Sequence, residues 1–270
     1  MTDLTRLASW LRCPVCGLDL EPVDRLTLGC AAGHRHDVNK RGYVSLLGGG
    51  SKFAGDTAEM LDARDTVLEG GAYAPIARAV AAAVPSAERV LDAGAGTGYY
   101  LRAVLAASPG AVGLAMDLSP AAVARTVRSS PDVDGLVADT WRPLPVRSHS
   151  ADAVLDVFAP RNLPEFHRVL RPGGTLAVVV PRADHLASLR AAGTMLDIPS
   201  DKAEDVIVAA EPLYAPLTRE HVSYELALDD ALRAALAGMG PSARHAAAAP
   251  AATDTTTVSV DVLTFTGRTT

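Results

Sequence analysis

A nine-residue segment, VLDAGAGTG from Val90 to Gly98, sets the strictest limit on the fold of this chain. An apolar run leads into three glycines that alternate with other residues, and a segment with helical character follows. Glycine lets a backbone pass close to a ligand without a Cβ clash, and the N-terminus of a helix offers free N–H groups. The segment therefore predicts a buried strand, a ligand-binding loop and a helix, the first unit of a nucleotide-binding α/β domain.

Strand and helix patterns alternate on the C-terminal side of this loop. We expect strands at residues 89–94, 111–119, 134–140, 150–160 and 175–181, separated by helices at 99–108, 120–130 and 163–174, the last ended by Pro-Gly-Gly. Two helices, 58–68 and 74–84, precede them. A strand (221–228), a helix (229–239) and a strand that alternates like an antiparallel edge strand (255–267) follow. The alternation predicts an α/β, doubly wound sheet. Residues 243–253 are expected to form a mobile loop.

Two acidic residues distinguish an S-adenosylmethionine (SAM) site from a nicotinamide site, the main alternative for a glycine-rich loop. Asp92 stands two residues before the first glycine, where its carboxylate can accept a hydrogen bond from the amino group of a methionine moiety. Asp117 ends the second strand, 25 residues after Asp92, in a place to hold ribose hydroxyls. The pattern predicts SAM as the cofactor. It is also similar to the first motif of the class I methyltransferases, which have a Rossmann-like sheet.

All three cysteines of the chain lie in its first 30 residues, at metal-ligand spacing. Cys13 and Cys16 form a Cys-x-x-Cys pair, and Cys30 and His34 form a second pair that can close a tetrahedron around Zn²⁺. Four protein ligands leave no open position, so we expect a structural zinc on which the folding of the segment depends. The alternatives are free cysteines, a redox pair, or His36 in place of His34.

Positive charge is concentrated at the front of the chain, although the net charge is −6. Residues 1–55 carry seven Lys/Arg and five Asp/Glu, whereas the other 215 residues carry 18 and 26. Local patches rather than net charge make phosphate contacts. We therefore expect RNA binding by Arg35, Lys40 and Arg41, which we place together on a short turn beside the last zinc ligand. The alternative is that they only keep a small domain in solution.

The length of 270 residues allows one α/β domain with a small appendage. We expect a zinc-binding RNA-recognition module at residues 1–47, a helical linker at 48–88 and the methyltransferase domain at 89–270. No apolar run approaches the roughly 20 residues that span a bilayer, and residues 1–12 lack the apolar core of a secretory signal. These features predict a cytoplasmic protein that does not contact a membrane.

From Cys13 to about His185 the chain resembles the bacterial 23S rRNA (guanine-N1)-methyltransferases, including the tylosin- and mycinamicin-resistance enzymes. The resemblance is carried by CPVC, HDVNKRGYVSLL, GDTAEMLDARDTVLEGGAYAPI, VLDAGAGTGYY, DVFAP, RVLRPGG and VPRADHL. It implies a zinc ribbon-like module on the SAM-binding sheet, a homodimer with an RNA-binding cleft, and methylation of a guanine in a 23S rRNA hairpin. It also implies resistance to macrolides such as tylosin.

The resemblance further implies which residues contact the two cofactors. The zinc ligands would be Cys13, Cys16, Cys30 and His34. The SAM contacts would be Tyr73, the loop residues Gly94, Gly96, Thr97, Gly98 and Tyr99, the pair Asp117 and Leu118, and His185. From the residues alone, Tyr73 is equally well a packed helix aromatic, and His185 an exposed residue at a helix start.

The residues around the expected target pocket depart from the enteric branch of the family. A basic residue is common there where this chain has Asp156, and Arg161-Asn162 also differs. Guanine N1 must lose a proton, so Asp156 and Glu165 are candidate bases. A capping role for Asp156 and a solvated position at a helix start for Glu165 explain these residues better, and no catalytic residue is assigned. The alternatives for the whole chain are a small-molecule methyltransferase, a demethylmenaquinone-type enzyme and a non-enzymatic RNA-binding protein.

Overall fold

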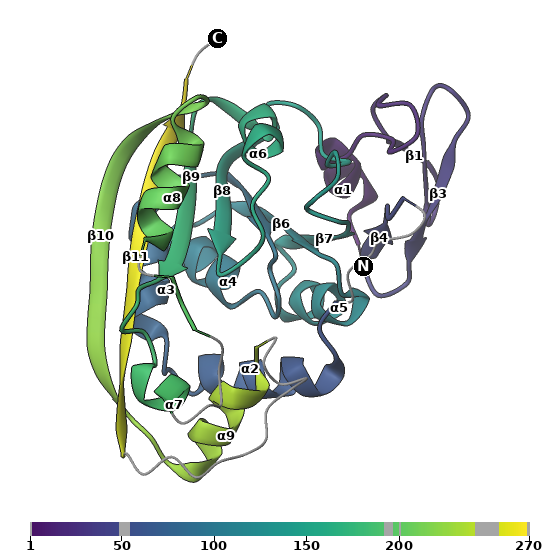
Figure 1. Ribbon diagram of the computed structural model, residues 1–270. Helices are drawn as coiled ribbons and strands as arrows, with labels where there is room; N and C mark the ends of the chain where they lie inside the picture. The colour runs from purple at the N-terminus through teal and green to yellow at the C-terminus, as the bar shows by residue number, and fades with distance from the viewer. Residues whose placement is uncertain (1, 49–54, 192–196, 200, 241–253, 269–270) are drawn as a thin grey trace.

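The computed structural model describes residues 2–48, 55–191, 197–199, 201–240 and 254–268. The loop expected at 243–253 and the larger part of the connector that follows residue 48 lie outside these residues. A central sheet runs through the described part, with the N-terminal module at one edge and two long strands at the other (Figure 1).

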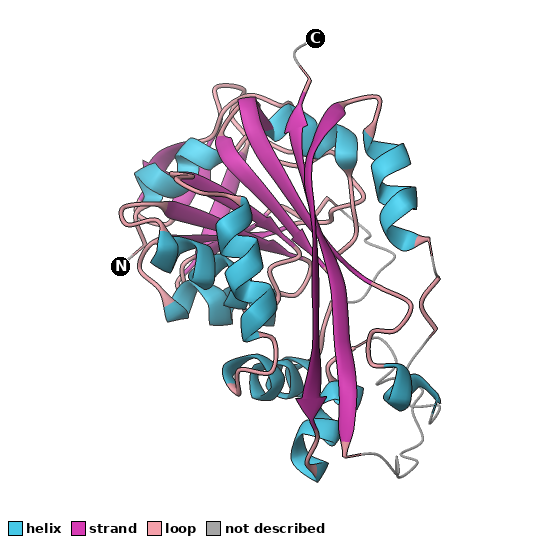
Figure 2. Cartoon of the chain, turned by 90° about the vertical axis from the view of Figure 1, so that its left-hand side faces the viewer, coloured by secondary structure: helices cyan, strands magenta, loops and turns pink. Residues whose placement is uncertain are grey.

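The centre of the sheet is parallel, in the strand order β7-β6-β5-β8-β9. Its strands are β5 (Arg89–Ala93), β6 (Val112–Asp117), β7 (Val133–Val137), β8 (Ala151–Val157) and β9 (Leu170–Pro181). Apart from the exposed residues 171–173 at the start of β9, these strands are almost wholly buried because helices cover both faces (Figure 2). This burial explains why they read as continuous apolar runs. The strand order reverses direction between β5 and β8, and ligands of such sheets bind at this point.

Helices cover the two faces of the sheet. On one face α3 (Ala74–Ala83), α4 (Tyr99–Ala107) and α7 (Ala187–Ala191) pack on the strands. On the other lie α6 (Leu163–Val169) and α8 (Lys202–Ala210). Three more helices of the sheet-bearing part of the chain are α2 (Ala58–Glu69), α5 (Pro120–Ser129) and α9 (Asp230–Gly238). Helices were correctly expected near 58–68, 74–84, 99–108 and 120–130. The helix expected at 163–174 ends earlier, at Val169, and the Pro-Gly-Gly segment belongs to β9.

The C-terminal strand was wrongly expected to be an edge strand. β11 (Thr255–Gly267) lies inside the sheet, antiparallel to both β9 and β10 (Tyr214–Ala227), and β10 forms the edge. The polar residues of β11 suggested solvent, but most of them are buried, among them Ser259, Asp261 and Thr264. The carboxylate of Asp261 is 1% exposed and forms ion pairs with Arg182 at 3.2 Å and Arg219 at 3.0 Å.

The N-terminal module continues the main sheet. It contains α1 (Leu4–Trp10), β1 (Glu21–Asp24), β2 (Thr27–Gly29), β3 (Arg35–Asn39) and β4 (Tyr43–Ser45). Strand β4 pairs in parallel with β7, so the sheet runs from the module into the central strands without a break.

Helix α1, which no sequence signal had suggested, fixes the module to the main sheet. The indole Nε1 of Trp10 and the guanidinium of Arg6 both donate to the buried carboxylate of Asp134, at 3.2 Å and 2.9 Å. The Arg89 guanidinium lies 3.7 Å above the Trp10 ring. The division of the chain at residues 47 and 88 stays a prediction.

Candidate cofactor, metal and RNA sites

The three cysteines and His34 converge in the N-terminal module. One ligand atom from each of Cys13, Cys16, Cys30 and His34 lies within 4.8 Å of all the others. The Cys16 and Cys30 sulfurs are 3.6 Å apart, and the Cys30 sulfur lies 3.4 Å from Nδ1 of His34. Two sulfurs bound tetrahedrally at about 2.3 Å from zinc are roughly 3.8 Å apart, so the donor set and its spacing fit a structural Zn²⁺.

His36 lies beside this cluster. Its Nε2 is 3.5 Å from the Cys13 sulfur, within reach of one cysteine, while His34 groups with all three. An imidazole N–H directed at a metal-bound thiolate is a common outer contact that orients the ligand. The geometry therefore favours His34 as the fourth ligand and gives His36 a supporting contact.

The glycine-rich loop lies at the carboxyl end of β5, where the strand order reverses. Gly94 has φ +91°, and a Cβ built there would lie 2.5 Å from the Cβ of Ala159. Gly98 has φ +76°, and a Cβ there would meet the side chain of Thr126. Both positions require glycine, because the backbone is left-handed and neighbouring atoms occupy the space of a side chain. The loop is thus packed against α5 and against the segment that follows β8.

Asp92 is a buried acid with an unused oxygen. Its side chain is 2% exposed, and Oδ2 has no hydrogen-bond partner. Burial, and then the nearby Asp117, raises the pKa of Asp92 to about 7. An isolated buried carboxylate is unfavourable unless a cation pairs with it. The site therefore fits the ammonium group of the methionine part of SAM, as the sequence predicts.

Asp117 lies at the end of β6 and has two backbone partners. Its Oδ2 accepts from the N–H of Gly96 at 2.9 Å, and its Oδ1 accepts from the N–H of Ser119 at 2.8 Å. Burial is the largest influence on its pKa, which is raised despite these two bonds. The carboxylate thus fixes the glycine loop, in addition to any contact with ribose hydroxyls. Leu118 follows it and is partly buried.

A cavity of about 420 Å³ opens beside the loop. Its lining includes six of the predicted residues: Tyr73, Asp92, Gly94, Gly96, Tyr99 and His185. Four others, namely Thr97, Gly98, Asp117 and Leu118, are not in this lining and belong to the start of α4 and the end of β6. Thr97 is buried, and its hydroxyl, like Oδ2 of Asp92, lacks a partner.

Tyr73 and His185 form a buried pair on one wall of the cavity. The Ser259 N–H donates to Nδ1 of His185 at 3.2 Å, so the proton of the neutral ring is on Nε2, which lies 3.3 Å from the Tyr73 hydroxyl oxygen. Burial, followed by the charge of Arg190, lowers the pKa of His185 to about 4. His185 is therefore neutral near pH 7, and it is not the exposed helix-start residue that the sequence allowed.

Sequence reasoning missed other residues of the cavity lining, among them Arg64, Lys202 and Phe158. Arg64 of α2 lies 2.5 Å from Asp56 and donates to the Met239 carbonyl at 2.9 Å. Lys202 begins α8, and Phe158 follows β8. Arg64 lies in the GDTAEMLDARDTVLEGGAYAPI block that carries the resemblance, although its side chain was not assigned to the site, and nothing in the sequence marks Lys202. Phe158 had a signal, since it is an aromatic residue directly after a strand whose end faces the site.

The two candidate proton acceptors differ in their surroundings. Glu165 accepts from the Leu144 N–H at 2.6 Å and pairs with Arg168 at 2.7 Å, contacts that give it a structural role. Asp156 is fully buried, and its nearest cation is Arg161 at 3.7 Å. Burial raises the pKa of Asp156 well above its usual value. Neither side chain is part of the cavity lining.

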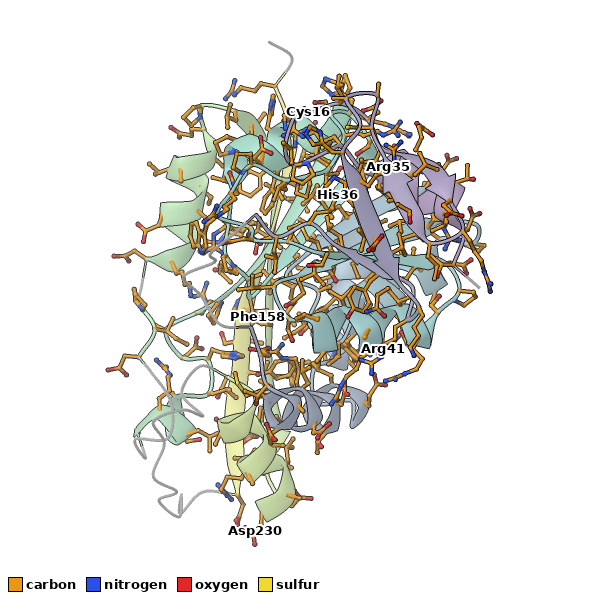
Figure 3. The ribbon with its side chains drawn as sticks, turned by 90° about the vertical axis from the view of Figure 1, so that its right-hand side faces the viewer. Cys16, Arg35, His36, Arg41, Phe158 and Asp230 are labelled. Carbon is orange, nitrogen blue, oxygen red and sulfur yellow. The ribbon has the colours of Figure 1, made fainter. Side chains whose placement is uncertain are left out.

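The three predicted RNA-binding residues do not share one turn, contrary to expectation. Arg35 begins β3 beside the zinc cluster, whereas Lys40 and Arg41 follow its other end. Five strand residues separate the two places by roughly 17 Å, at about 3.3 Å per residue. Figure 3 shows Arg35 and Arg41 at opposite ends of the strand. All three side chains are exposed, so they offer two small basic spots in place of one.

Comparison with protein families gives two matches. Residues 90–174 match a family described as "Methyltransferase domain", and residues 11–52 match one described as "RlmA, N-terminal". Among the described residues, no helix is long and apolar enough to cross a membrane. The two matches correspond to the cavity-bearing sheet and to the zinc module, so the chain is a SAM-dependent methyltransferase with a zinc ribbon.

Curated relatives and solved structures agree with this. The chain is 41% identical to the 23S rRNA (guanine(748)-N(1))-methyltransferase of Streptomyces fradiae, over 87% of this chain and 86% of that one. It is 43% identical to a Micromonospora griseorubida relative named for the same guanine-N1 activity, over 87% of both. The crystal structure of MccD protein has a similar fold, with a TM-score of 0.51 and 14% identity over 74% of this chain and 98% of that one. By its sequence and its two matched regions, the chain belongs to the 23S rRNA (guanine-N1)-methyltransferase family.

Proposed function

We propose that the protein transfers the methyl group of SAM to N1 of one guanine in a hairpin loop of 23S rRNA. One observation carries the proposal: a single chain of this family joins the zinc cluster to a cavity in which a buried carboxylate oxygen of Asp92 lacks a partner. A SAM ammonium would supply that partner. We further propose that the protein is cytoplasmic and homodimeric, and that the modification gives resistance to macrolides such as tylosin.

The proposed SAM contacts follow the geometry of the loop. Asp92 holds the amino group, the backbone from Gly94 to Tyr99 follows the cofactor, and Asp117 with Leu118 holds the ribose. The pair Tyr73 and His185 forms the opposite wall. Bound SAM supplies an electrophilic methyl group on a sulfonium. The residues of the chain would bind it, orient its methyl group toward the substrate and exclude water.

The substrate has to present an unpaired base. Guanine N1 carries a proton that takes part in base pairing, so the base must leave its pair and lose this proton when the methyl is transferred. In a hairpin loop the base is already unpaired, so little free energy is needed to expose it. We leave the proton acceptor unassigned. We propose that Arg35 contacts RNA phosphates near the zinc cluster, and that Lys40 and Arg41 contact them at the far end of β3.

The test is methylation of 23S rRNA that lacks the modification. The protein is incubated with this RNA and tritiated SAM, and the modified position is mapped by primer extension, because N1-methylguanine stops reverse transcription. We expect a single stop at a guanine in a hairpin loop. The Gly98→Trp variant is the control, since a side chain at this position would meet Thr126 and displace the loop. Label found only on small molecules, or spread over many RNA positions, would contradict the proposal.

A further inference from the structure

Phe158 has a backbone conformation that its side chain disfavours. It follows the end of β8 with φ +54°, in the left-handed region. Bulky residues rarely adopt this conformation, because Cβ then approaches the carbonyl oxygen. Such residues persist only where the surrounding structure fixes them, and they concentrate at functional sites. The conformation of Phe158 is therefore a reason to ask what its ring does.

Several contacts fix the turn that contains Phe158 to the rest of the protein. The N–H of Phe158 donates to the Val179 carbonyl at 3.2 Å, and the next residue, Ala159, lies against Gly94 of the cofactor loop. Arg161 lies 3.7 Å from the buried carboxylate of Asp156 and 3.5 Å from the Ala159 carbonyl. Phe158 is thus fixed to β9, to the glycine loop and to a buried acid, so its position relative to the cofactor loop is defined.

The turn leaves the ring of Phe158 partly in solvent. One side lies near three aromatic rings of the cavity wall, with centroid distances of 6.1 Å to Tyr73, 6.4 Å to Tyr100 and 6.0 Å to His185. The residue nevertheless keeps 40% of its surface exposed and lines the cavity. Figure 3 shows it on the side of the molecule that also carries the zinc module. The outer face of the ring is therefore accessible to a ligand in the cavity.

We infer that Phe158 is the platform on which the unpaired guanine stacks while it receives the methyl group. This inference rests on the proposed function. An exposed aromatic face at the mouth of the cofactor cavity can stack on a base that has left its helix, as aromatic residues do in other single-strand binding sites. Because the turn is rigid, it would fix the position of the stacked base relative to the cofactor loop. The aromatic ring, rather than its apolar volume, is the required property.

The experiment compares Phe158→Trp, which keeps an aromatic face, with Phe158→Leu, which keeps an apolar side chain only. The substrate is a hairpin transcript that contains the guanine mapped for the unchanged protein. We expect the leucine variant to lose roughly 10- to 100-fold in kcat/KM for the transcript, the range for loss of one base–aromatic stack. The tryptophan variant should stay within about threefold of the unchanged protein. Because Phe158 also lines the cofactor cavity, SAM affinity is measured alongside and should fall much less in the leucine variant than kcat/KM for the transcript. Thermal unfolding checks that each variant is folded.

A second readout observes stacking directly. In a transcript with 2-aminopurine in place of the mapped guanine, the unchanged protein should quench the fluorescence of the extruded base, and the leucine variant should leave it bright. The inference would be overturned if the leucine variant methylated the transcript, or quenched the fluorescence, as well as the unchanged protein. It would also be overturned if the leucine variant lost SAM affinity by the same factor as kcat/KM, because Phe158 would then contact the sulfonium of SAM. If the unchanged protein methylates no RNA, the proposed function itself fails and the inference falls with it.

Discussion

SAM affinity should depend on pH through Asp92. The pKa of this carboxyl is raised to about 7 because the group is buried and lies near a second acid. A SAM ammonium binds the ionised form, so binding below pH 7 requires the loss of a proton from Asp92. The nearby His185, with its pKa lowered to about 4, stays neutral throughout the range and does not contribute. Between pH 6 and pH 7, affinity should therefore rise with pH.

The size of this effect follows from the pKa. With a value of about 7, roughly one-eleventh of the Asp92 carboxyls are ionised at pH 6 and one-half at pH 7. SAM should therefore bind about 5.5-fold more tightly at pH 7, which corresponds to about 1 kcal/mol. Binding should release about 0.9 proton per SAM at pH 6 and about 0.5 at pH 7. The α-amino group of SAM titrates higher, near pH 7.7–8.0.

Calorimetry in two buffers of different ionisation enthalpy measures both the affinity and the released protons. The Asp92→Asn variant has nearly the same shape and cannot ionise, so it should bind SAM more weakly and without this pH dependence. In the protein without SAM, the same substitution should instead raise the free energy of unfolding near neutral pH. Because the folded pKa of Asp92 is raised, its contribution to stability is present below about pH 4 and is lost as the pH rises through about 7. An unchanged pH dependence in Asp92→Asn would refute the assignment.

Four other predictions concern the metal, the loop, the RNA and the module. Protein purified without added zinc should contain close to one equivalent by metal analysis, and Cys30→Ser should lose it; a variant that keeps the metal would exclude Cys30 as a ligand. Asp117→Ala should weaken SAM binding by about 1.5–3 kcal/mol and also lower stability to urea, since two backbone N–H groups lose their acceptor. Replacing Lys40 and Arg41 with alanine should reduce the salt dependence of RNA affinity by roughly one unit of slope per lost phosphate contact, with SAM affinity unchanged; an unchanged slope would remove this turn from RNA binding. Asp134→Ala should cost about 2–4 kcal/mol in urea unfolding, because it leaves the buried indole N–H of Trp10 without an acceptor and removes the ion pair of the partly buried Arg6; a loss under 1 kcal/mol would mean that α1 does not depend on this acid.

The central sheet could be predicted closely because its strands are buried on both faces. Apolar residues such as Val90 and Leu91 are stable only when they are buried inside the protein. Each such run ends where a glycine or a capping residue begins the next element. The same reasoning failed for β11. A polar residue within a strand looks alike in the sequence whether it faces water or, as Asp261 does, a buried ion pair.

The site residues that could be predicted are those whose ligand-binding groups lie close together in the sequence. The zinc ligands and the glycine loop are of this kind. Arg35 and Arg41 were placed together because the seven residues from 35 to 41 can form a turn or a strand with equal ease, and only the pairing of β3 with its neighbours decides. Asp117 was expected to contact only the ligand, since its bonds to the loop depend on tertiary geometry. No propensity rule predicts a phenylalanine at φ +54°.

The pairing of β4 with β7 has a consequence for how the chain can be divided. A strand whose N–H and C=O groups face open space is a template for pairing with other chains, and proteins shield such edges. Here residues 43–45 occupy that position along residues 135–137 of β7. Cutting the chain after residue 47 would uncover an apolar edge of the main sheet and invite self-association. The N-terminal module therefore protects the edge of β7 from pairing with other chains. A truncated protein that begins after residue 47 should aggregate even though its cofactor loop is intact.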